Sequence, residues 1–409
     1  MKVADIRFMI FGLLVTVSAT FGQTYFLGVL QPEIRADYGL SESTFARLYL
    51  LVTLGSAIGV SLLGGYIDRT PLPRYMMVLS ATLAVSVVTM AVSGPLWLLF
   101  MGMLFARLLG QGMMVHAAMA SMTRYFTRLR GRALAVSSMG VSVGLAVFPV
   151  MLTALIPLYG WRQSVLILVG GFAFFILPLM MLCLKGHGVR HAAWLAAEEK
   201  SADVLKNTTI TSQEGAGPKS YRRSDMLKDW RFYAVVPVLI LAAYWITALF
   251  FFADQVAAMR GLTLTELTGS YYIYAITGAL TPFWAGWLVD KYTAKRLLWL
   301  PAFTMGISIL VLTQTQWPIA IFMAFLGIAG SVSIPIMNAL WAELFGTRYI
   351  GEIKGVTNAV TVLSTALAPF MLGEFLTLGI AFDTLAEASF LHIGVAGAIG
   401  ILFLFVQDR

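Results

Sequence analysis

The chain has 409 residues, of which 59% are apolar and 12% are charged. Soluble proteins carry about 25% charged residues, so this balance excludes a soluble globular domain, a disordered chain and a nucleic-acid-binding domain. The single cysteine, Cys183, excludes an intrachain disulfide and a cysteine metal cluster. The net charge of +8 is therefore interpreted as membrane topology and not as a signal for an acidic partner.

Long apolar segments follow one another along the chain. A membrane-spanning helix needs about 20 mostly apolar residues, and turn sequences such as Ser93-Gly94-Pro95 separate many of the segments. The first segment is too long for a signal-peptide core, so we interpret it as a retained span. The sequence predicts an all-α integral membrane protein with twelve transmembrane helices, at 8–30, 46–66, 75–93, 96–122, 134–157, 162–184, 232–258, 267–289, 295–315, 317–343, 353–378 and 384–406.

The distribution of lysine and arginine predicts the orientation of these helices. If the N-terminus is cytoplasmic, 23 of the 28 basic residues fall on the inner side, four fall on the outer side, and Arg107 lies within a span. Basic residues gather on the cytoplasmic side of membrane proteins. We therefore expect a multi-pass protein of the inner (plasma) membrane with both termini in the cytoplasm.

One polar segment, 185–229, interrupts the alternation after the sixth span and is rich in Ser, Thr, Lys and Glu. The sequence thus predicts an N-terminal six-helix bundle at 1–184, a cytoplasmic linker at 185–229 and a C-terminal six-helix bundle at 230–409. Within the linker, the part around 191–205 has the pattern of a surface amphipathic helix.

The two predicted bundles share a pattern. Gly64-x-x-x-Asp68-Arg69, followed by Arg74, corresponds to Gly286-x-x-x-Asp290-Lys291, followed by Arg296, at an offset of 222 residues. Further matches recur at an offset of 220. Such a repeat predicts two pseudo-symmetric bundles that rock around a central site, and the two glycines are expected to let neighbouring helices approach closely.

Both aspartates of this pattern lie at the cytoplasmic ends of their helices, where the helix dipole favours cations. They are better placed if they pair with arginine or with the N-terminus of another helix, and the alternative is that they are solvated loop residues. We predict a cytoplasmic gate made of Asp68, Arg69, Arg74, Asp290, Lys291 and Arg296.

These motifs resemble those of the major facilitator superfamily. Gly64-x-x-x-Asp68-Arg69 is similar to that superfamily's signature between helices 2 and 3, and Arg107-Leu-Leu-Gly110-Gln111-Gly112 is similar to its helix 4 motif. Gly140-x-x-x-Gly144, followed by Pro149, is a loose version of its helix 5 motif. The resemblance covers the whole chain and implies a secondary transporter that works by alternating access as a monomer.

Within the superfamily, the segment 125–135 resembles a loop of the oxalate–formate antiporter and monocarboxylate transporter branch, and so do Gly160-Trp161-Arg162 and the segment 343–348. The resemblance implies a small carboxylate substrate. The chain departs from that branch in helix 8, where Gly278-Ala279 stands in place of a basic residue, and in helix 11, which lacks a central lysine.

Arg107 is the deepest cation of the predicted spans, and an ionisable residue at such depth is a candidate for function. It would hold an anionic substrate by a forked hydrogen bond or pair with helix 1 groups such as Gln23. The alternative is a structural arginine that binds backbone carbonyls. Gln111 lies one turn further along the same face.

Two other ionisable residues are candidates for proton coupling. His116 lies lower in helix 4 and titrates near physiological pH, or it is a hydrogen-bonded packing residue. Asp254, next to Gln255, closes an aromatic stretch of helix 7, where it would take up a proton, contact a cation or lie in water at the outer mouth.

Other polar and aromatic side chains within the spans are expected to line the substrate cavity, although each also fits a role in bridging helices or in packing. With Arg107, Gln111, Asp254 and Gln255, the predicted substrate contacts are Gln23, Tyr25, Trp245, Tyr271, Tyr274, Asn338 and Asn358.

We therefore predict a secondary active transporter, not an enzyme, that moves a small organic anion together with a proton. The sequence holds no nucleotide-binding motif and no nucleophile–base pair, so we expect no cofactor, no metal and no nucleic-acid partner. An efflux carrier for amphipathic or cationic compounds is the first alternative, and a solute sensor on a transporter scaffold is the second. Copper transport is a third, because helix 4 is rich in methionine.

Overall fold

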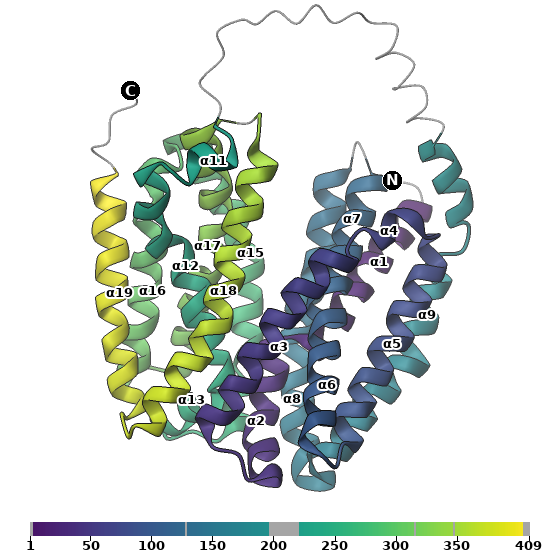
Figure 1. Ribbon diagram of the computed structural model, residues 1–409, viewed down its shortest axis with the longest axis horizontal. Coiled ribbons are helices and arrows are strands. Elements are labelled where there is room, and N and C mark those ends of the chain that lie inside the picture. The colour runs from purple at the N-terminus through teal and green to yellow at the C-terminus, as the bar shows by residue number, and fades with distance from the viewer. Residues whose placement is uncertain (1–2, 127–128, 196–220, 315, 347, 404–409) are drawn as a thin grey trace, which may run out of the picture. The chain divides into compact units, whose positions relative to one another are not determined.

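A computed structural model describes residues 3–126, 129–195, 221–314, 316–346 and 348–403 (Figure 1). Within these ranges the chain is helical and contains no strand. The prediction of an all-α protein is confirmed.

The first part of the chain forms helices interrupted by short irregular segments. They are α1 (Val3–Ser18), η1 (Ala19–Gly22), α2 (Thr24–Tyr38), α3 (Glu42–Leu63), α4 (Tyr66–Arg69), α5 (Leu72–Val92), α6 (Leu96–Ala106), η2 (Arg107–Met114), α7 (Val115–Tyr125), α8 (Arg130–Gly171), η3 (Phe172–Ile176) and α9 (Leu177–Cys183).

The second part of the chain continues the pattern with longer uninterrupted helices. They are α11 (Arg223–Met226), α12 (Trp230–Phe251), α13 (Ala253–Met259), α14 (Leu264–Thr268), α15 (Tyr271–Tyr292), η4 (Lys295–Leu297), α16 (Leu300–Thr313), α17 (Ile319–Phe345), α18 (Ile350–Thr377) and α19 (Phe382–Leu402).

Ten helical stretches within the described residues are long and apolar enough to cross a membrane. One of them, Arg130–Cys183, holds two spans, because Gly160 adopts a positive φ of 72° and turns the chain between them. α15 has 22 residues, but its tyrosines and tryptophans lower its mean hydropathy. With these two spans added, the helices account for the predicted twelve.

The helices form two compact units. Unit 1 comprises Met1–Gln23, Ser56–Gly144 and Arg162–Gly217, and unit 2 comprises Thr24–Gly55, Leu145–Trp161 and Pro218–Arg409. These units group segments by close contact, whereas the halves 1–184 and 230–409 rest on the internal repeat. The halves and the linker boundaries therefore stay a prediction.

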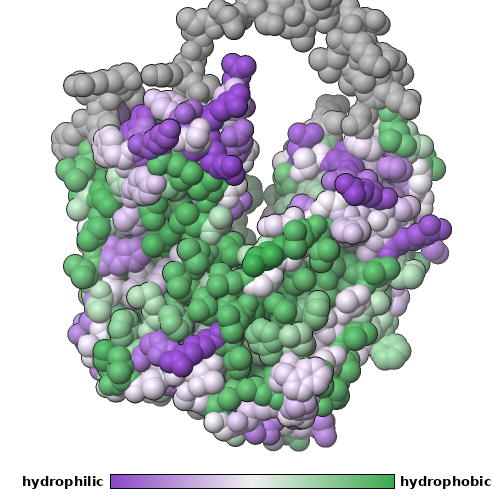
Figure 2. All heavy atoms as spheres, in the orientation of Figure 1, coloured by the Kyte–Doolittle hydropathy of each residue, from purple (hydrophilic) through white to green (hydrophobic). Residues whose placement is uncertain are grey.

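Apolar side chains cover much of the molecular surface. On the face shown in Figure 2, hydrophobic residues lie over the middle of the helices and hydrophilic residues gather toward their ends. Helices that cross a hydrocarbon layer and end in the headgroup region have this distribution.

α12 begins at a capped N-terminus. Asp229 accepts a hydrogen bond from the backbone N–H of Arg231 at 2.8 Å and another from its guanidinium at 2.6 Å. The bonds from the guanidinium lower the pKa of the Asp229 carboxyl. α12 ends at Phe251, so the predicted span 232–258 is wrong in its last turns, and Asp254 lies in the separate short helix α13.

The beginning of the linker is helical over 187–195, whereas the predicted helix was 191–205, of which 196–205 lies outside the described residues. Phe8, His187, His191 and Trp194 stack in one row, with successive ring centroids 5.6, 6.1 and 5.6 Å apart. Tyr125 meets His187 edge-on at 4.8 Å. These rings hold the linker helix against α1 and α7 in unit 1.

His187 lies inside this row of rings and is 7% exposed. Burial lowers the pKa of its imidazole to about 4, and the nearby charges of His191, Arg190 and Arg124 act in the same direction. The imidazole is therefore neutral at physiological pH.

Candidate functional site

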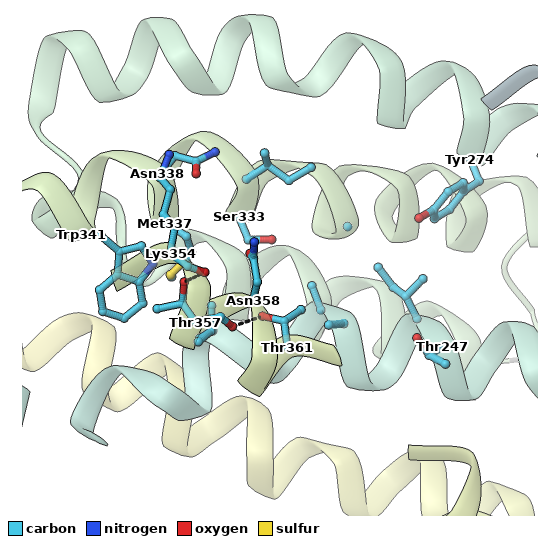
Figure 3. A pocket seen from close by; sticks show the side chains of 16 residues that line it. Thr247, Tyr274, Ser333, Met337, Asn338, Trp341, Lys354, Thr357, Asn358 and Thr361 are labelled. Carbon is cyan, nitrogen blue, oxygen red and sulfur yellow. Dashed lines mark hydrogen bonds between the residues drawn. The ribbon is translucent and has the colours of Figure 1, made fainter. Parts of the chain in front are cut away.

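Unit 2 contains a cavity of about 380 Å³ between α12, α15, α17 and α18. Figure 3 shows Lys354, Asn338 and Trp341 toward one end of it, and Thr247 and Tyr274 toward the other. The volume suits a small organic molecule. We call this space the Lys354 cavity.

One face of α18 supplies much of the polar lining. Lys354, Thr357, Asn358 and Thr361 are spaced three and four residues apart, so they project from the same side of the helix. The Thr357 hydroxyl donates to the carbonyl of Lys354 at 3.2 Å, and the Thr361 hydroxyl donates to the carbonyl of Thr357 at 2.9 Å. Lys354 is the one charged residue among the described residues that line the cavity.

The opposite wall is formed mainly by α17. Ser333, Met337, Asn338 and Trp341 line it, and Gly330 leaves room for the ring of Tyr274 from α15. A Cβ on Gly330 would lie 2.9 Å from the Tyr274 hydroxyl. Amides, hydroxyls and aromatic rings therefore surround a single cation.

Three of the predicted substrate contacts line this cavity: Tyr274, Asn338 and Asn358. Trp245 faces elsewhere, because its indole N–H donates to Nδ1 of His392 at 3.1 Å. The other nitrogen of His392, Nε2, lies 3.0 Å from the carbonyl of Pro237 and donates to it in the neutral imidazole. Tyr271 is buried against Phe250, with ring centroids 5.0 Å apart.

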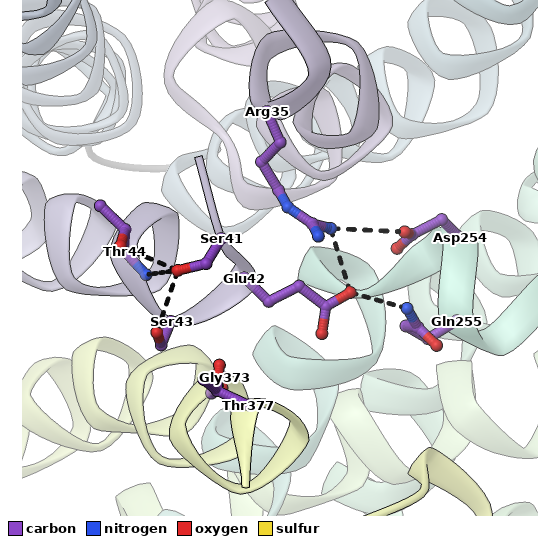
Figure 4. Close-up of polar contacts among 9 residues, drawn as sticks. All are labelled: Arg35, Ser41, Glu42, Ser43, Thr44, Asp254, Gln255, Gly373 and Thr377. Atoms are coloured by element: carbon purple, nitrogen blue, oxygen red, sulfur yellow. Dashed lines mark hydrogen bonds and ion pairs between the residues drawn. The ribbon is translucent and has the colours of Figure 1, made fainter. Parts of the chain in front are cut away.

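Asp254 and Gln255 belong to a separate polar cluster in unit 2 (Figure 4). Nη1 of Arg35 lies 3.0 Å from Oε1 of Glu42 and 4.0 Å from Oδ2 of Asp254. Gln255 donates to Oε1 of Glu42 at 2.8 Å. Oδ1 of Asp254 is buried and has no hydrogen-bond partner within the described part of the chain. Two carboxylates therefore share one guanidinium.

A second ion pair of unit 2 joins α3 to α18. The guanidinium of Arg47 binds both carboxylate oxygens of Glu374, at 2.5 and 2.7 Å. The two helices approach closely beside it, because a Cβ on Gly373 would lie 2.8 Å from the Cβ of Ala46. Neither Arg47 nor Glu374 is among the site residues predicted from the sequence.

Arg107 lies in unit 1 at the crossing of η1 and η2. Helix 1 breaks after Gly22, where Gln23 is extended, so the Gly22 carbonyl is available to another donor. Nη1 of Arg107 donates to this carbonyl at 3.1 Å, and the side chain is 2% exposed. The contact favours the alternative of a structural arginine that binds backbone.

Glycine makes this crossing possible. A Cβ on Gly22 would lie 2.4 Å from the carbonyl oxygen of Ala106, and a Cβ on Gly110 would lie 2.8 Å from the nitrogen of Gly22. η2 is a π-helix, a conformation found frequently at functional sites. Oε1 of Gln111 is buried there without a hydrogen-bond partner among the described residues.

The remaining candidates of helices 1 and 4 are not among the residues that line the Lys354 cavity. Gln23 is half-buried, and its backbone N–H donates to Thr20 at 2.9 Å. Tyr25 is buried in unit 2 and its ring meets Phe250 at 6.4 Å. His116 is exposed on α7, with Nε2 3.6 Å from a Cβ built on Gly64.

Of the predicted gate residues, Asp68 forms an ion pair with Arg124, so the expected pairing with arginine is present within unit 1. Arg69 and Arg74 are exposed, and Arg69 and His187 line the same cavity of unit 1. Their gating role stays a prediction.

In the second copy of the motif, Asp290 is exposed and Nζ of Lys291 lies over the rings of Trp287 and Tyr292. Arg296 is exposed as well. A Cβ on Gly286 meets open space, so the expected close helix approach there is wrong.

Solved structures share this fold. A bacterial homologue of the human lysosomal transporter Spinster is similar with a TM-score of 0.66 and 16% identity, over 98% of this chain and 97% of that chain. The xylose transporter XylE from E. coli is similar with a TM-score of 0.64 and 15% identity, over 99% and 96%. At these identities the likenesses show the fold alone, which is that of solved multi-pass membrane proteins.

A family model of the Major Facilitator Superfamily matches residues 12–369 and 256–409. The chain belongs to the Major Facilitator Superfamily. It is therefore a secondary transporter that binds a small molecule within a lipid bilayer.

Two distant curated relatives match most of the chain, and a third matches about a third of it. The glucose transporter GlcP of Staphylococcus epidermidis is 22% identical over 91% of this chain and 86% of its own length. The gallate transporter of Pseudomonas putida is 22% identical over 92% of this chain and 86% of its own length. The multidrug resistance protein 3 of Bacillus subtilis is 31% identical over 34% of this chain and 26% of its own length.

Proposed function

We propose that this transporter carries a small organic anion, such as a monocarboxylate, together with a proton, and that the Lys354 cavity is its substrate site. The observation that carries the proposal is the single ammonium group among the described lining residues, beside two amides and several hydroxyls. A carboxylate gains a charge-assisted hydrogen bond from Lys354, and Asn338 and Asn358 are placed to bind further oxygens.

Two likenesses support an anionic substrate. The gallate transporter carries, by its name, an aromatic carboxylate, and the sequence motifs resemble the oxalate–formate and monocarboxylate branch. The charge that this branch places in helix 8 is absent from Gly278-Ala279, and Lys354 supplies a cation from α18 instead.

The polar cluster of Arg35, Glu42 and Asp254 is proposed as the proton site. Its two carboxylates exceed its one cation, and Oδ1 of Asp254 is buried without a partner among the described residues. A proton on Asp254 removes the excess negative charge at this site. Loss of that proton restores a carboxylate that competes with Glu42 for Arg35.

The same proposal includes the oligomeric state, the membrane location and the transport mechanism. The protein works as a monomer in the inner (plasma) membrane, with both termini in the cytoplasm. Its two halves, 1–184 and 230–409, alternate access around the substrate while the linker 185–229 connects them.

Ligand-dependent thermal stability of the purified protein tests the substrate class. Each small carboxylate is compared with its uncharged amide, and lipophilic cations are included. A ligand that binds the folded state raises its stability by about 2.7 kcal/mol at a hundredfold excess over Kd. We expect the carboxylate to stabilise the wild type and the amide to have no effect, and Lys354→Gln to abolish the difference while Lys228→Gln, an exposed cation of the same unit, preserves it.

The efflux alternative predicts the opposite response. If only lipophilic cations or bulky aromatic compounds stabilise the protein, the anion proposal is overturned. The aromatic rings of Trp341 and Tyr274 are then the substrate contacts. If cells that produce the protein resist such a compound, and Asp254→Asn abolishes that resistance, the protein is an exporter.

Proton coupling is tested separately in proteoliposomes. We expect Asp254→Asn to abolish accumulation driven by a pH gradient while substrate exchange at equal concentrations continues. Accumulation that survives this substitution would place the proton elsewhere.

A further inference from the structure

A second concave surface lies on the membrane side of unit 2, away from the Lys354 cavity. α16 and α19 run side by side (Figure 1), and a groove of about 410 Å³ lies between them. It is lined by Trp299, Ala302, Phe303, Gly306, Ile307, Leu310, Phe390, Ile393, Gly397 and Ile401. Both helices are long and apolar enough to cross a membrane, so we infer that lipid lies outside this groove.

Glycine gives the groove its depth. A Cβ on Gly397 would meet the Cβ of Ala302 at 3.6 Å, and a Cβ on Gly306 would meet Ile393 at 3.4 Å, so the two helices touch here without long side chains between them. Larger apolar side chains form the walls of the groove. Those of Phe303 and Leu310 are 54% and 51% exposed, and covering them with apolar chains is more favourable than exposing them to water.

The groove has a cationic end. Residues 294–300 have helical backbone angles, so Arg296 continues the row formed by Trp299, Phe303 and Leu310 at spacings of three, four and seven. Arg296 is exposed and lies one turn before Trp299, at the end that the sequence places in the cytoplasm. The nearby carboxylate of Glu343 is engaged by the backbone N–H groups of Ala294 and Lys295, at 2.7 and 3.2 Å.

We propose that the α16–α19 groove is a binding site for an anionic phospholipid of the cytoplasmic leaflet. The acyl chain lies along Phe303, Gly397 and Leu310, and the phosphate receives hydrogen bonds from the guanidinium of Arg296. Trp299 stands between them, where an indole prefers the boundary of hydrocarbon and headgroups. The distance from Trp299 to Leu310 along the helix is about 16 Å, comparable with an extended acyl chain.

Charge complementarity selects the headgroup. A guanidinium donates two parallel hydrogen bonds to a phosphate, and a basic residue at the membrane surface attracts anionic lipid with a free energy that corresponds to about fivefold in affinity. A zwitterionic lipid with the same chains fills the same groove but lacks the net charge. The site therefore predicts preference between lipids that differ in the headgroup alone.

Native mass spectrometry of the purified full-length protein tests this preference. Delipidated protein is titrated with phosphatidylglycerol or with phosphatidylcholine of identical acyl chains, and the fraction of lipid-bound protein is measured. We expect phosphatidylglycerol to be retained about fivefold better by the wild type. Arg296→Gln removes the preference, whereas Lys228→Gln, an exposed cation outside the groove, retains it.

A second variant tests the place of the acyl chain. Gly397→Leu adds a side chain at a residue that lines the groove, and its Cβ is in ordinary van der Waals contact with Ala302 at 3.6 Å. It is expected to lower the retention of both lipids at an unchanged melting temperature. Equal retention of the two lipids by the wild type overturns the proposal, and so does a preference that survives Arg296→Gln. If Gly397→Leu fails to fold, Arg296→Gln alone decides.

Discussion

Arg107 and Lys354 are both cations of the membrane-spanning region, and their surroundings differ in kind. Arg107 is almost fully buried and donates to the backbone carbonyl of Gly22, in a crossing where two helices touch through glycine. Lys354 is half-exposed at the edge of an open cavity lined by amides and hydroxyls. A buried cation that binds the protein's own backbone holds helices together, whereas a cation that faces a cavity has donors for a ligand.

The largest expected effect concerns the glycine crossing. Gly22→Ala places a Cβ 2.4 Å from the carbonyl oxygen of Ala106 and 2.6 Å from the nitrogen of Gln111, so backbone must move. We expect a loss of about 3 kcal/mol of stability, at the upper end for overpacked sites, measured as a lower melting temperature. Gly65→Ala is the control, because its Cβ meets open space. A Gly22→Ala protein as stable as the control contradicts a tight crossing.

Lys354→Gln tests the cavity side of the comparison. Loss of one charge-assisted hydrogen bond costs about 2 kcal/mol, which corresponds to about a 30-fold weaker anion affinity. The melting temperature without ligand should remain that of the wild type, because the side chain is half-exposed. Binding of a radiolabelled carboxylate measures the effect, and an unchanged Kd would remove Lys354 from the site.

Arg107→Ala should show the reverse pattern. The Gly22 carbonyl loses a donor in a buried place, which costs about 1–3 kcal/mol of stability. The intrinsic Kd for the anion is expected to change little in the fraction that stays folded. A strong loss of anion affinity at unchanged stability would instead restore Arg107 as a substrate contact, as the sequence first suggested.

The His187 cluster adds a dependence on pH. The folded protein holds the pKa of His187 at about 4, below its usual 6.5, so the unfolded chain binds a proton at higher pH than the folded one. Above pH 6.5 the imidazole is neutral in both states, and the free energy of unfolding has its full value. As the pH falls from about 6.5 to about 4, the unfolded chain binds the proton first, so the free energy of unfolding decreases. His187→Phe keeps the stacked row without a titrating group, and its melting temperature should fall less over that interval. Parallel pH curves for both proteins would contradict this assignment.

The smallest effect is expected at Arg47 and Glu374. The pair is bidentate, but the Arg47 side chain is 58% exposed, so solvent screens it. Exposed ion pairs contribute little to stability because water and salt screen them. A double-mutant cycle with Arg47→Gln and Glu374→Gln measures the coupling in the melting temperature, and a coupling as large as the effect of Arg107→Ala would show that the pair is shielded in the membrane.

Hydropathy and charge were sufficient to predict the class of fold. Runs of apolar residues and the distribution of lysine and arginine follow directly from the cost of burying charge in lipid. The predicted boundaries failed where a helix breaks, as at Phe252, where no proline or glycine marks the break. Gly22 and Gly160 mark other breaks, but a glycine in an apolar segment is also common in packed helices.

The candidate site was predicted only in part. Tyr274, Asn338 and Asn358 were identified, because polar residues within spans are few. Lys354 was not among the predicted substrate contacts, although its spacing to Thr357, Asn358 and Thr361 indicates a polar stripe on one face of a helix. Trp245 could not be assigned from sequence, since its partner His392 lies 147 residues away.

The π-helical segment Arg107–Met114 also fixes how the rest of helix 4 is oriented. A π segment accommodates extra backbone within an otherwise α-helical rod, and each residue of an α-helix turns the chain by about 100°. Because the wide turns absorb the extra backbone locally, deleting one residue there would close this segment into regular α-helix, whereas a deletion after Met114 would rotate the residues that follow by about 100° and turn Arg124 away from Asp68. Substitutions within the segment are restricted for a different reason, because Arg107 and Gly110 both contact the backbone of Gly22.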